Sequence, residues 1–162
     1  MSIFPTKILL ATDGSTEAEL AARTAVDLSQ NTNSELHLIH VLDVAKVGLS
    51  MVVLYSEATD PEAVKLPDPV LEEDLEQLAK QGGTEVLEAE VQRVRSAGGT
   101  VAHSHLRMGE VEGEIVHLAE ELGAGLIVMG SRGHGGMRRA LMGSVSDSVV
   151  RHAHCPVVVV RH

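Results

Sequence analysis

The sequence predicts an α/β protein built on a parallel β-sheet that helices cover on both faces. Two observations carry this prediction. Short, continuously apolar runs such as KILLAT (7–12) and PVVVV (156–160) are typical of strands buried on both faces. Between such runs lie longer segments with helical apolar periodicity, and strands that alternate with helices form parallel sheets.

Five strands and four helices follow from this pattern. Ser15 or Thr16 is expected to cap the first helix, because a hydroxyl side chain can accept a hydrogen bond from a free backbone N–H group. The length of 162 residues fits a single domain over 1–162. The predicted strands are 7–12, 35–42, 100–107, 125–129 and 156–160, and the predicted helices are about 16–30, 69–97, 109–122 and 144–152.

Two stretches fit the pattern less simply. Residues 43–69 contain prolines and no clear periodicity, so we expect a flexible crossover there, in which Met51–Leu54 either covers a ligand or contacts a partner. The helix over 69–97 has an apolar stripe that includes Leu78, Leu87 and Val94. The pair Gly82-Gly83 lies in the middle of this helix and is expected to kink or break it.

Composition argues against several classes of function. Phe4 and Tyr55 are the only Phe, Tyr or Trp residues, so the chain has no aromatic platform for single-stranded nucleic acid. A net charge of −10 argues against general nucleic-acid binding. No apolar stretch reaches the roughly 20 residues of a membrane span, and no secretory signal pattern is recognised. Because the single cysteine suits a reducing compartment, we expect a cytoplasmic protein.

The charge distribution indicates a local anion site. Every acidic residue except Asp147 precedes residue 131, whereas five arginines follow residue 130. An acidic body with one basic segment favours a local site for an anion over an extended basic face. The alternative is that these arginines are simply solvated.

A glycine-rich segment after the fourth predicted strand has the features of a phosphate site. Gly130 ends that strand, and the following loop, 131–136, contains three glycines whose backbone N–H groups can converge on an anion. Ser144 is the expected N-cap of the last helix, directly after Gly143 and with Asp147 three residues later. A helix N-terminus attracts phosphate. Three cationic side chains lie between Gly130 and the helix, namely Arg132, Arg138 and Arg139.

A family resemblance adds to this interpretation. On spacing alone the segment also fits an ordinary flexible connection, since it is neither a Walker A loop nor a GxGxxG motif. The run GSRGHGGMRRALMGSVSDSVVRHAHCPVVVV, however, resembles the C-terminal signature of the universal stress protein family, specifically its ATP-binding branch. KILLATDGS, ELHLIHVLD and GEVEGEIVHLAEELGAGLIVMG resemble further segments of that family, so the resemblance covers nearly the whole chain.

The resemblance implies a fold and a set of binding residues. The implied fold is Rossmann-like and adenine nucleotide alpha hydrolase-like, with five parallel strands in the order 3-2-1-4-5 and a ligand at the carboxyl ends of strands 1 and 4. Asp13 is expected near the ribose or a phosphate-bound Mg²⁺, and the backbone of Val41 near the adenine. The residues implied to bind ATP are Ala11, Thr12, Asp13, Val41, Met129, Gly130, Arg132, Gly133, Gly143, Ser144, Val145 and Ser146.

Several residues keep simpler interpretations. Asp13 also fits the role of an ordinary turn residue after the first strand. The nine histidines raise the question of a metal site, and His103 and His105 share one face of a strand. A structural zinc site, however, normally takes thiolate ligands, and the chain has one cysteine. This residue, Cys155, is expected to be a buried small side chain rather than a nucleophile.

Three functions fit the sequence. The leading hypothesis is a nucleotide-responsive regulatory module of the stress response, in which bound ATP orders a surface that an unknown protein partner recognises. The alternatives are a slow Mg²⁺-dependent ATPase or nucleotidyl transferase that uses Asp13, and a nucleotide-free interaction module of the same fold. The intact spacing of Gly130, Gly133 and Gly143-Ser144 argues against the last. Any hydrolysis is expected to be weak, because no water-positioning base or arginine finger is recognised.

The last strand predicts a homodimer. In the order 3-2-1-4-5 it lies at an edge of the sheet, and its apolar run is protected only by Pro156. Antiparallel pairing of two copies about a two-fold axis would close this edge, and the resemblance implies the same arrangement. The alternative is a monomer in which residues 43–69 cover the edge.

Overall fold

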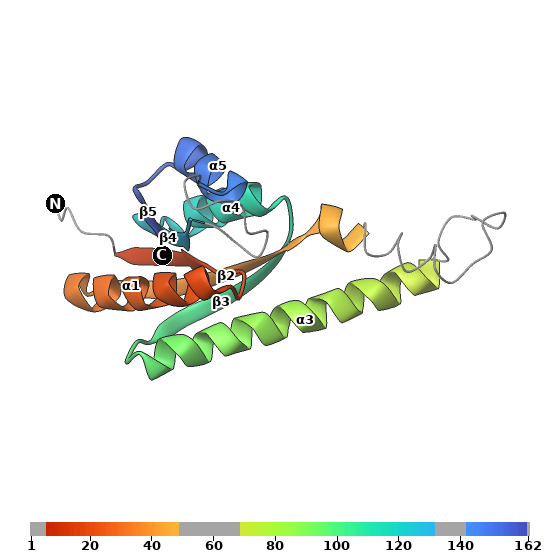
Figure 1. The fold of residues 1–162 in the computed structure, drawn as a ribbon, viewed down its shortest axis with the longest axis horizontal. Helices are drawn as coiled ribbons and strands as arrows, with labels where there is room; N and C mark the ends of the chain where they lie inside the picture. The colour runs from red at the N-terminus through yellow and green to blue at the C-terminus, as the bar shows by residue number, and fades with distance from the viewer. Residues whose placement is uncertain (1–5, 49–68, 132–141, 162) are drawn as a thin grey trace.

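Five parallel strands form one sheet in the order β3-β2-β1-β4-β5 (Figure 1). The structure, a computed structural model, describes residues 6–48, 69–131 and 142–161. The predicted fold class and strand order are confirmed. The strands are β1 (Lys7–Ala11), β2 (Glu35–Asp43), β3 (Val101–Gly109), β4 (Leu126–Gly130) and β5 (Val157–Val160).

Helices cover the two faces of the sheet in separate layers (Figure 1). The first two long helices, α1 and α3, pack on one face, and α4 and α5 pack on the other. Both layers arise because each helix connects two parallel strands and must cross back over the sheet. The helices are α1 (Thr16–Thr32), α3 (Pro69–Ser96), α4 (Val111–Leu122) and α5 (Ser144–His152), and residues 44–48 form a further helical stretch after β2.

Alternate residues of each central strand pack against the helices on opposite faces of the sheet. In β1, Ile8 and Leu10 belong to the core under α1 and α3, whereas Leu9 and Ala11 belong to the core under α4 and α5. Ile8, Leu9 and Leu10 have no exposed surface, which explains why this strand is apolar throughout. Full burial of each such side chain contributes about 1.5–3 kcal/mol to the free energy of unfolding.

Local sequence signals set the ends of two helices. Ser15 is the N-cap of α1, since its hydroxyl accepts a hydrogen bond from the backbone N–H of Ala18 at 3.3 Å. The expectation of Ser15 or Thr16 is therefore confirmed for Ser15. Helix α1 ends at Asn33, and α4 ends at Gly123, each in the left-handed conformation that reverses the chain after a helix.

The prediction of a break at Gly82-Gly83 was wrong. Helix α3 is continuous from Pro69 to Ser96. Gly83 is buried where α3 crosses β2 and β3, and a Cβ atom at this position would lie 2.8 Å from Leu106 Cδ1 and 3.0 Å from Leu42 Cδ2. The glycine therefore lets the helix approach the sheet closely, and tertiary packing outweighs its low helix propensity.

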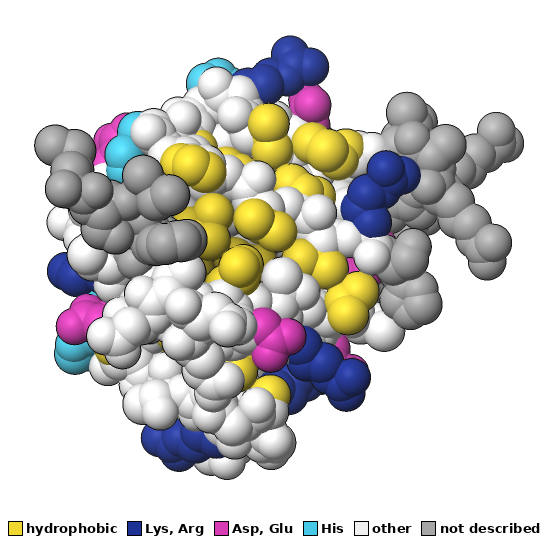
Figure 2. All heavy atoms as spheres, turned by 90° about the vertical axis from the view of Figure 1, so that its left-hand side faces the viewer, with side chains coloured by type: hydrophobic (Ala, Val, Ile, Leu, Met, Phe, Trp, Pro, Cys, Tyr) yellow, Lys and Arg dark blue, Asp and Glu magenta, His cyan; other side chains and the backbone are white. Residues whose placement is uncertain are grey.

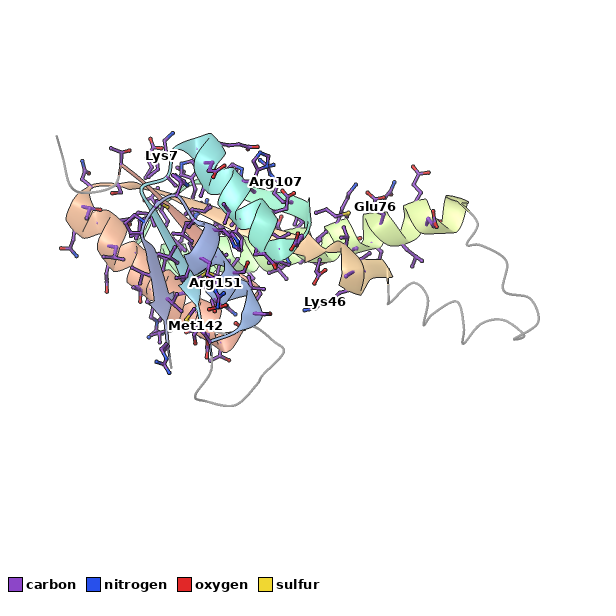
Figure 3. The ribbon with its side chains drawn as sticks, turned by 90° about the horizontal axis from the view of Figure 1, so that it is seen from above. Lys7, Lys46, Glu76, Arg107, Met142 and Arg151 are labelled. Atoms are coloured by element: carbon purple, nitrogen blue, oxygen red, sulfur yellow. The ribbon has the colours of Figure 1, made fainter. Side chains whose placement is uncertain are left out.

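The first part of α3 extends past the sheet (Figure 1), and Figure 3 labels Glu76 on this part. Leu78, expected in the apolar stripe, is 65% exposed, so this expectation was wrong, whereas Leu87 and Val94 are buried over the sheet. The region predicted as a flexible crossover, with the apolar run 51–54, lies largely outside the described residues. Within the described part of the chain, no helix is both long and apolar enough to span a membrane.

The two adjacent glycines of α3 offer a direct test of this packing. Gly83→Val should lower the free energy of unfolding by about 1–3 kcal/mol, because the added methyl groups overpack the contact with Leu42 and Leu106. Gly82→Val is the control, since a Cβ atom at Gly82 meets no atom within 4 Å. Urea denaturation of both variants checks the prediction, and equal effects would contradict it.

Candidate functional site

The carboxyl ends of β1 and β4 lie side by side at the centre of the sheet. Ile8, Leu9 and Leu10 pair in parallel with residues 126–128. The chain leaves β1 toward α1 on one face and leaves β4 toward α5 on the other. This point, where the strand order reverses, is the place at which open α/β sheets leave a crevice for ligands.

Thr12, directly after β1, is held by a hydrogen bond at each of its polar groups. Its backbone N–H donates to Ile39 O at 3.0 Å, and its carbonyl accepts from His40 Nδ1 at 2.8 Å. Its hydroxyl donates to Glu90 Oε2 at 3.0 Å and accepts from the backbone N–H of Gly14 at 3.2 Å. Contacts with β2, α3 and the following turn thus fix the end of β1.

Asp13 lies in the turn between β1 and α1. Its Oδ1 atom accepts a hydrogen bond from the backbone N–H of Ser15 at 2.9 Å, an arrangement that orders the turn. Gly14, with φ of +78°, supplies the left-handed conformation that this turn needs. The carboxylate is half-buried and stands at the N-terminus of α1. The turn role considered for Asp13 is therefore real, and it presents the carboxylate at the carboxyl edge of the sheet.

Ser131, directly after β4, joins the two ends of the glycine-rich segment. Its carbonyl accepts from the backbone N–H of Gly143 at 2.7 Å and from Ser146 Oγ at 2.8 Å. Its own N–H donates to Val160 O at 2.8 Å, which continues the pairing of β4 with β5. The chain therefore leaves β4 and returns to start α5 at the same place. Figure 3 labels Met142, where the described chain resumes ahead of α5.

The start of α5 differs from the prediction in one respect. Gly143, not Ser144, is the N-cap, and no side chain caps this end. Ser144 is the first helical residue, and Ser146 turns its hydroxyl back to Gly143 O at 3.0 Å. The first backbone N–H groups of a helix lack acceptors within the helix and carry a partial positive charge. Without a side-chain cap, these groups can face an anion.

A carboxylate from α1 also reaches this place. Glu17 Oε2 accepts a hydrogen bond from Ser131 Oγ at 2.9 Å, which ties the first turn of α1 to the end of β4. Asp13, in the turn before α1, and Glu17, in the first turn of α1, thus put two carboxylates at the carboxyl edge of the sheet. Phosphate groups placed among these carboxylates would need a counter-charge, and oxygen ligands of this kind suit Mg²⁺.

A third carboxylate lies beneath the site. Glu90 of α3 is fully buried, and its Oε2 atom accepts from Thr12 Oγ1 and from Arg93 Nη1 at 3.2 Å. Its Oε1 atom is buried and finds no hydrogen-bond partner within the described part of the chain. Burial raises the pKa of this carboxyl, and the hydrogen bond from Thr12 and the charge of Arg93 oppose the rise.

The structure brings most of the predicted residues to one edge. Val41 follows the part of β2 that pairs with β1, so it lies at the same end of the sheet as Asp13. Arg132 and Gly133 lie outside the described residues. The others stand at the ends of β1 and β4 or at the start of α5, namely Ala11, Thr12, Asp13, Met129, Gly130, Gly143, Ser144, Val145 and Ser146.

Sequence reasoning missed four side chains at this edge. Glu17 lies in the predicted first helix and His40 in the predicted second strand, and neither was expected to have a role in the site. Ser131 and Glu90 were not singled out. The spacing of Glu90 does carry a signal, because it lies three residues after Leu87 and four before Val94 on the buried face of α3. A carboxylate on the buried face of a helix requires a polar partner inside the protein.

Comparison with known proteins identifies the family. The model of the universal stress protein family matches residues 5–161. The chain belongs to the universal stress protein family. Among curated relatives of this family, Universal stress protein MJ0531 of Methanocaldococcus jannaschii is 34% identical over 155 residues, which cover 96% of this chain and 81% of the relative. Universal stress protein YxiE of Bacillus subtilis is 34% identical over 155 residues, which cover 96% and 98%.

Solved structures with the same fold agree with the family assignment. The protein MJ0577 superposes with a TM-score of 0.75 at 25% identity and 97% and 96% coverage of the two chains. A universal stress protein from Archaeoglobus fulgidus, solved in complex with dAMP, has a TM-score of 0.63 at 24% identity and 99% and 100% coverage. A universal stress protein solved in complex with cAMP has a TM-score of 0.64 at 21% identity and 98% coverage of both.

A second group of titratable residues lies away from this edge, between β2 and β3. His37 is buried, with Nδ1 3.4 Å from His105 Nε2 and Nε2 3.3 Å from Glu35 Oε2. The rings of His103 and His105 are 6.3 Å apart, and their placement on one face is confirmed. In the described part of the chain, no three His, Cys, Asp or Glu side chains are arranged to hold a metal ion. Burial raises the pKa of the half-buried Cys155 thiol, consistent with an unreactive side chain.

His105 gives the fold a defined pH dependence. Burial first, and then the neighbouring His37 and Arg107, lower its pKa, so folding favours the neutral imidazole. Figure 3 shows Arg107 beside α4, where it donates to Glu121 Oε2 at 2.7 Å. Because the folded pKa is below that of the unfolded chain, stability is fully present above about pH 6.5 and decreases as the pH falls below it.

The contribution of His105 can be measured by comparing melting temperatures. Between about pH 7.5 and pH 5, His105→Gln should lose less thermal stability than the wild type, because it cannot take up this proton. His154→Gln, which changes an exposed histidine, should follow the wild-type profile. A wild-type profile for His105→Gln as well would show that His105 does not carry the effect.

Proposed function

We propose that this chain binds an adenine nucleotide, ATP in particular, and acts as a nucleotide-responsive regulatory module of the stress response in the cytoplasm. One observation carries the proposal. Ser131 closes the base of the glycine-rich segment against Gly143 and donates to Glu17 of α1, so the uncapped start of α5 stands at the carboxyl end of β4, where the first turn of α1 also contacts this strand end. In this proposal residues 1–162 act as one domain.

The phosphates would meet the start of α5. The backbone N–H groups of Ser144, Val145 and Ser146 are the first of the helix, and the helix dipole favours an anion there. Arg132 and Gly133 belong to the proposed site through the motif alone. Asp13, and beside it Glu17, would hold Mg²⁺ against the phosphates, because a hard cation prefers oxygen ligands.

The base and ribose would lie along the edge toward β2. Met129 and Val41 are buried apolar residues at the ends of β4 and β2, and Ala11 lies between them at the end of β1. Such a surface suits an adenine ring, and the part of β2 that continues past the end of β1 would face its polar edge. The dAMP and cAMP complexes of related proteins support the choice of an adenine nucleotide.

We also propose a homodimer that pairs β5 with its copy. Strand β5 lies at the edge of the sheet, and its four valines are half-buried. Figure 2 shows hydrophobic side chains gathered at the centre of the side of the molecule that lies on the left in Figure 1, where β5 is found. A strand edge of this kind favours pairing with a second chain, and a two-fold axis would make the contact self-complementary.

Ligand binding should stabilise the native protein. If ATP binds only the folded chain, ATP with Mg²⁺ at ~100 times its dissociation constant should add roughly 2.7 kcal/mol to the free energy of unfolding. Thermal melts with ATP-Mg²⁺, with GTP-Mg²⁺ and without nucleotide provide the measurement. The absence of a shift at millimolar ATP would contradict the proposed function, and an equal shift with GTP would contradict adenine specificity.

A charge placed at the start of α5 separates phosphate binding from folding. Ser144→Glu should weaken ATP binding by about tenfold or more, since the new carboxylate repels the phosphates, while fold stability stays equal or rises by ~0.3–1 kcal/mol through the helix dipole. Ser148→Glu adds the same charge one turn later and is the matched control. Titration calorimetry measures both affinities. Equal affinities in the two variants would place the phosphates elsewhere.

The hydrogen bonds of β5 determine where the dimer can be disrupted. The carbonyls of Pro156 and Val160 accept from β4, so by alternation Val157 and Val159 direct their backbone groups to the free edge. Val159→Pro should therefore produce a monomer, because it removes an outward donor, whereas Val158→Pro should damage the pairing with β4. Sedimentation of the wild type at micromolar concentration should give twice the 17.2 kDa chain mass. A single 17.2 kDa species would refute the dimer.

A further inference from the structure

Glu90 occupies a position where an apolar side chain would be expected. It lies on the face of α3 that packs on the sheet, between the buried residues Leu87 and Val94, and has no exposed surface. Desolvation makes an ionised carboxylate costly at such a position, and one of its two oxygens has no hydrogen-bond partner among the residues that the structure describes. Replacing buried ionic groups by apolar ones of similar volume is often neutral or stabilising. Stability of the fold alone therefore does not account for Glu90.

The contacts of Glu90 lead directly to the candidate site. Its Oε2 atom accepts the hydroxyl proton of Thr12 at 3.0 Å, across 78 residues of sequence. Because this proton is committed to Glu90, the oxygen of the Thr12 hydroxyl is directed to accept the backbone N–H of Gly14 at 3.2 Å. That bond spans Asp13, so the orientation of one hydroxyl group orders the turn that presents the Asp13 carboxylate.

We propose that Glu90 is a positioning residue of the nucleotide site, which acts through the Thr12 hydroxyl to hold the turn 12–15 in the conformation that receives the ligand. The inference rests on the proposed function, since it assigns a role within the same site. Glu90 is fully buried and reaches the turn through the hydroxyl of Thr12. Burial of the Glu90 carboxylate lowers the stability of the fold, and in this proposal the same carboxylate preorganises the turn.

The charged groups around Glu90 fit this role. Arg93, one turn away on α3, donates to the same Oε2 atom at 3.2 Å and partly neutralises it. The Asp13 carboxylate, in the turn, raises the pKa of the Glu90 carboxyl, whereas Arg93 lowers it. From β2, His40 binds the carbonyl of Thr12 at 2.8 Å, on the other side of the same residue. Thr12 is thus held between α3 and β2, and Glu90 is the contact that fixes its hydroxyl.

Two substitutions at Glu90 and one control separate positioning from stability. Glu90→Gln keeps an oxygen that can accept from Thr12, whereas Glu90→Met fills a similar volume without an acceptor. Glu88→Met, at an exposed position of the same helix, is the matched control. Each protein is examined in three ways: thermal melting, hydrogen exchange of the backbone amides of 12–15 without nucleotide, and titration calorimetry with ATP-Mg²⁺.

Glu90→Met should melt at or above the wild-type temperature, exchange the Gly14 and Ser15 amides about three- to tenfold faster, and bind ATP about three- to tenfold more weakly. Glu90→Gln should restore slow exchange and near wild-type affinity, and Glu88→Met should match the wild type.

Unchanged exchange at 12–15 in Glu90→Met would overturn the inference, as would a lower melting temperature with unchanged exchange and affinity. If the wild type binds no ATP but Glu90→Met loosens the turn, the proposed function fails while the coupling of Glu90 to the turn stands.

Discussion

Burial of the parallel sheet on both faces is the constraint on which the rest of the structure depends. With α1 and α3 on one side and α4 and α5 on the other, the faces of the central strands have no surface left for a ligand. A ligand can then meet the backbone only where the strands end, and the reversal of strand order between β1 and β4 opens the carboxyl edge at that point. The position of the candidate site is thus a consequence of topology, and the local sequence decides only its chemistry.

Hydrogen bonds of buried polar groups shape this edge. Thr12 and Ser131 stand at equivalent places after β1 and β4, and each binds two or more elements beyond its own strand. Through them α1, α3 and α5 are fixed relative to the strand ends. Buried groups of this kind are costly when unpaired, so the arrangement tolerates few alternatives. The result is a preorganised rim of backbone N–H groups and carboxylates, with the glycine-rich segment anchored at Ser131.

Sequence alone was sufficient for whatever depends on neighbours along the chain. Continuous apolar runs predicted β1, β4 and β5, and Ser15 predicted the start of α1. It was insufficient where a distant contact decides. Gly83 has low helix propensity, and only its contacts with side chains of β2 and β3 explain its place in a continuous helix. Glu17 and Ser131 form a hydrogen bond although 114 residues separate them in the sequence. Gly143, not Ser144, is the N-cap, and its N–H group donates to Ser131, from before the loop. The Arg132 and Gly133 assignments still rest on the motif.

Backbone amide chemical shifts measured by NMR during titration with ATP-Mg²⁺ test the central claim most directly. The account predicts that the perturbed amides cluster at the carboxyl edge of the sheet, in the turn 12–15, at Met129–Ser131 and over Gly143–Ser146, with smaller changes near Val41. The amides of β3 and of the exposed first part of α3 should remain unchanged. Saturable binding with perturbations centred elsewhere, or no perturbation at millimolar nucleotide, would contradict a nucleotide site at this edge.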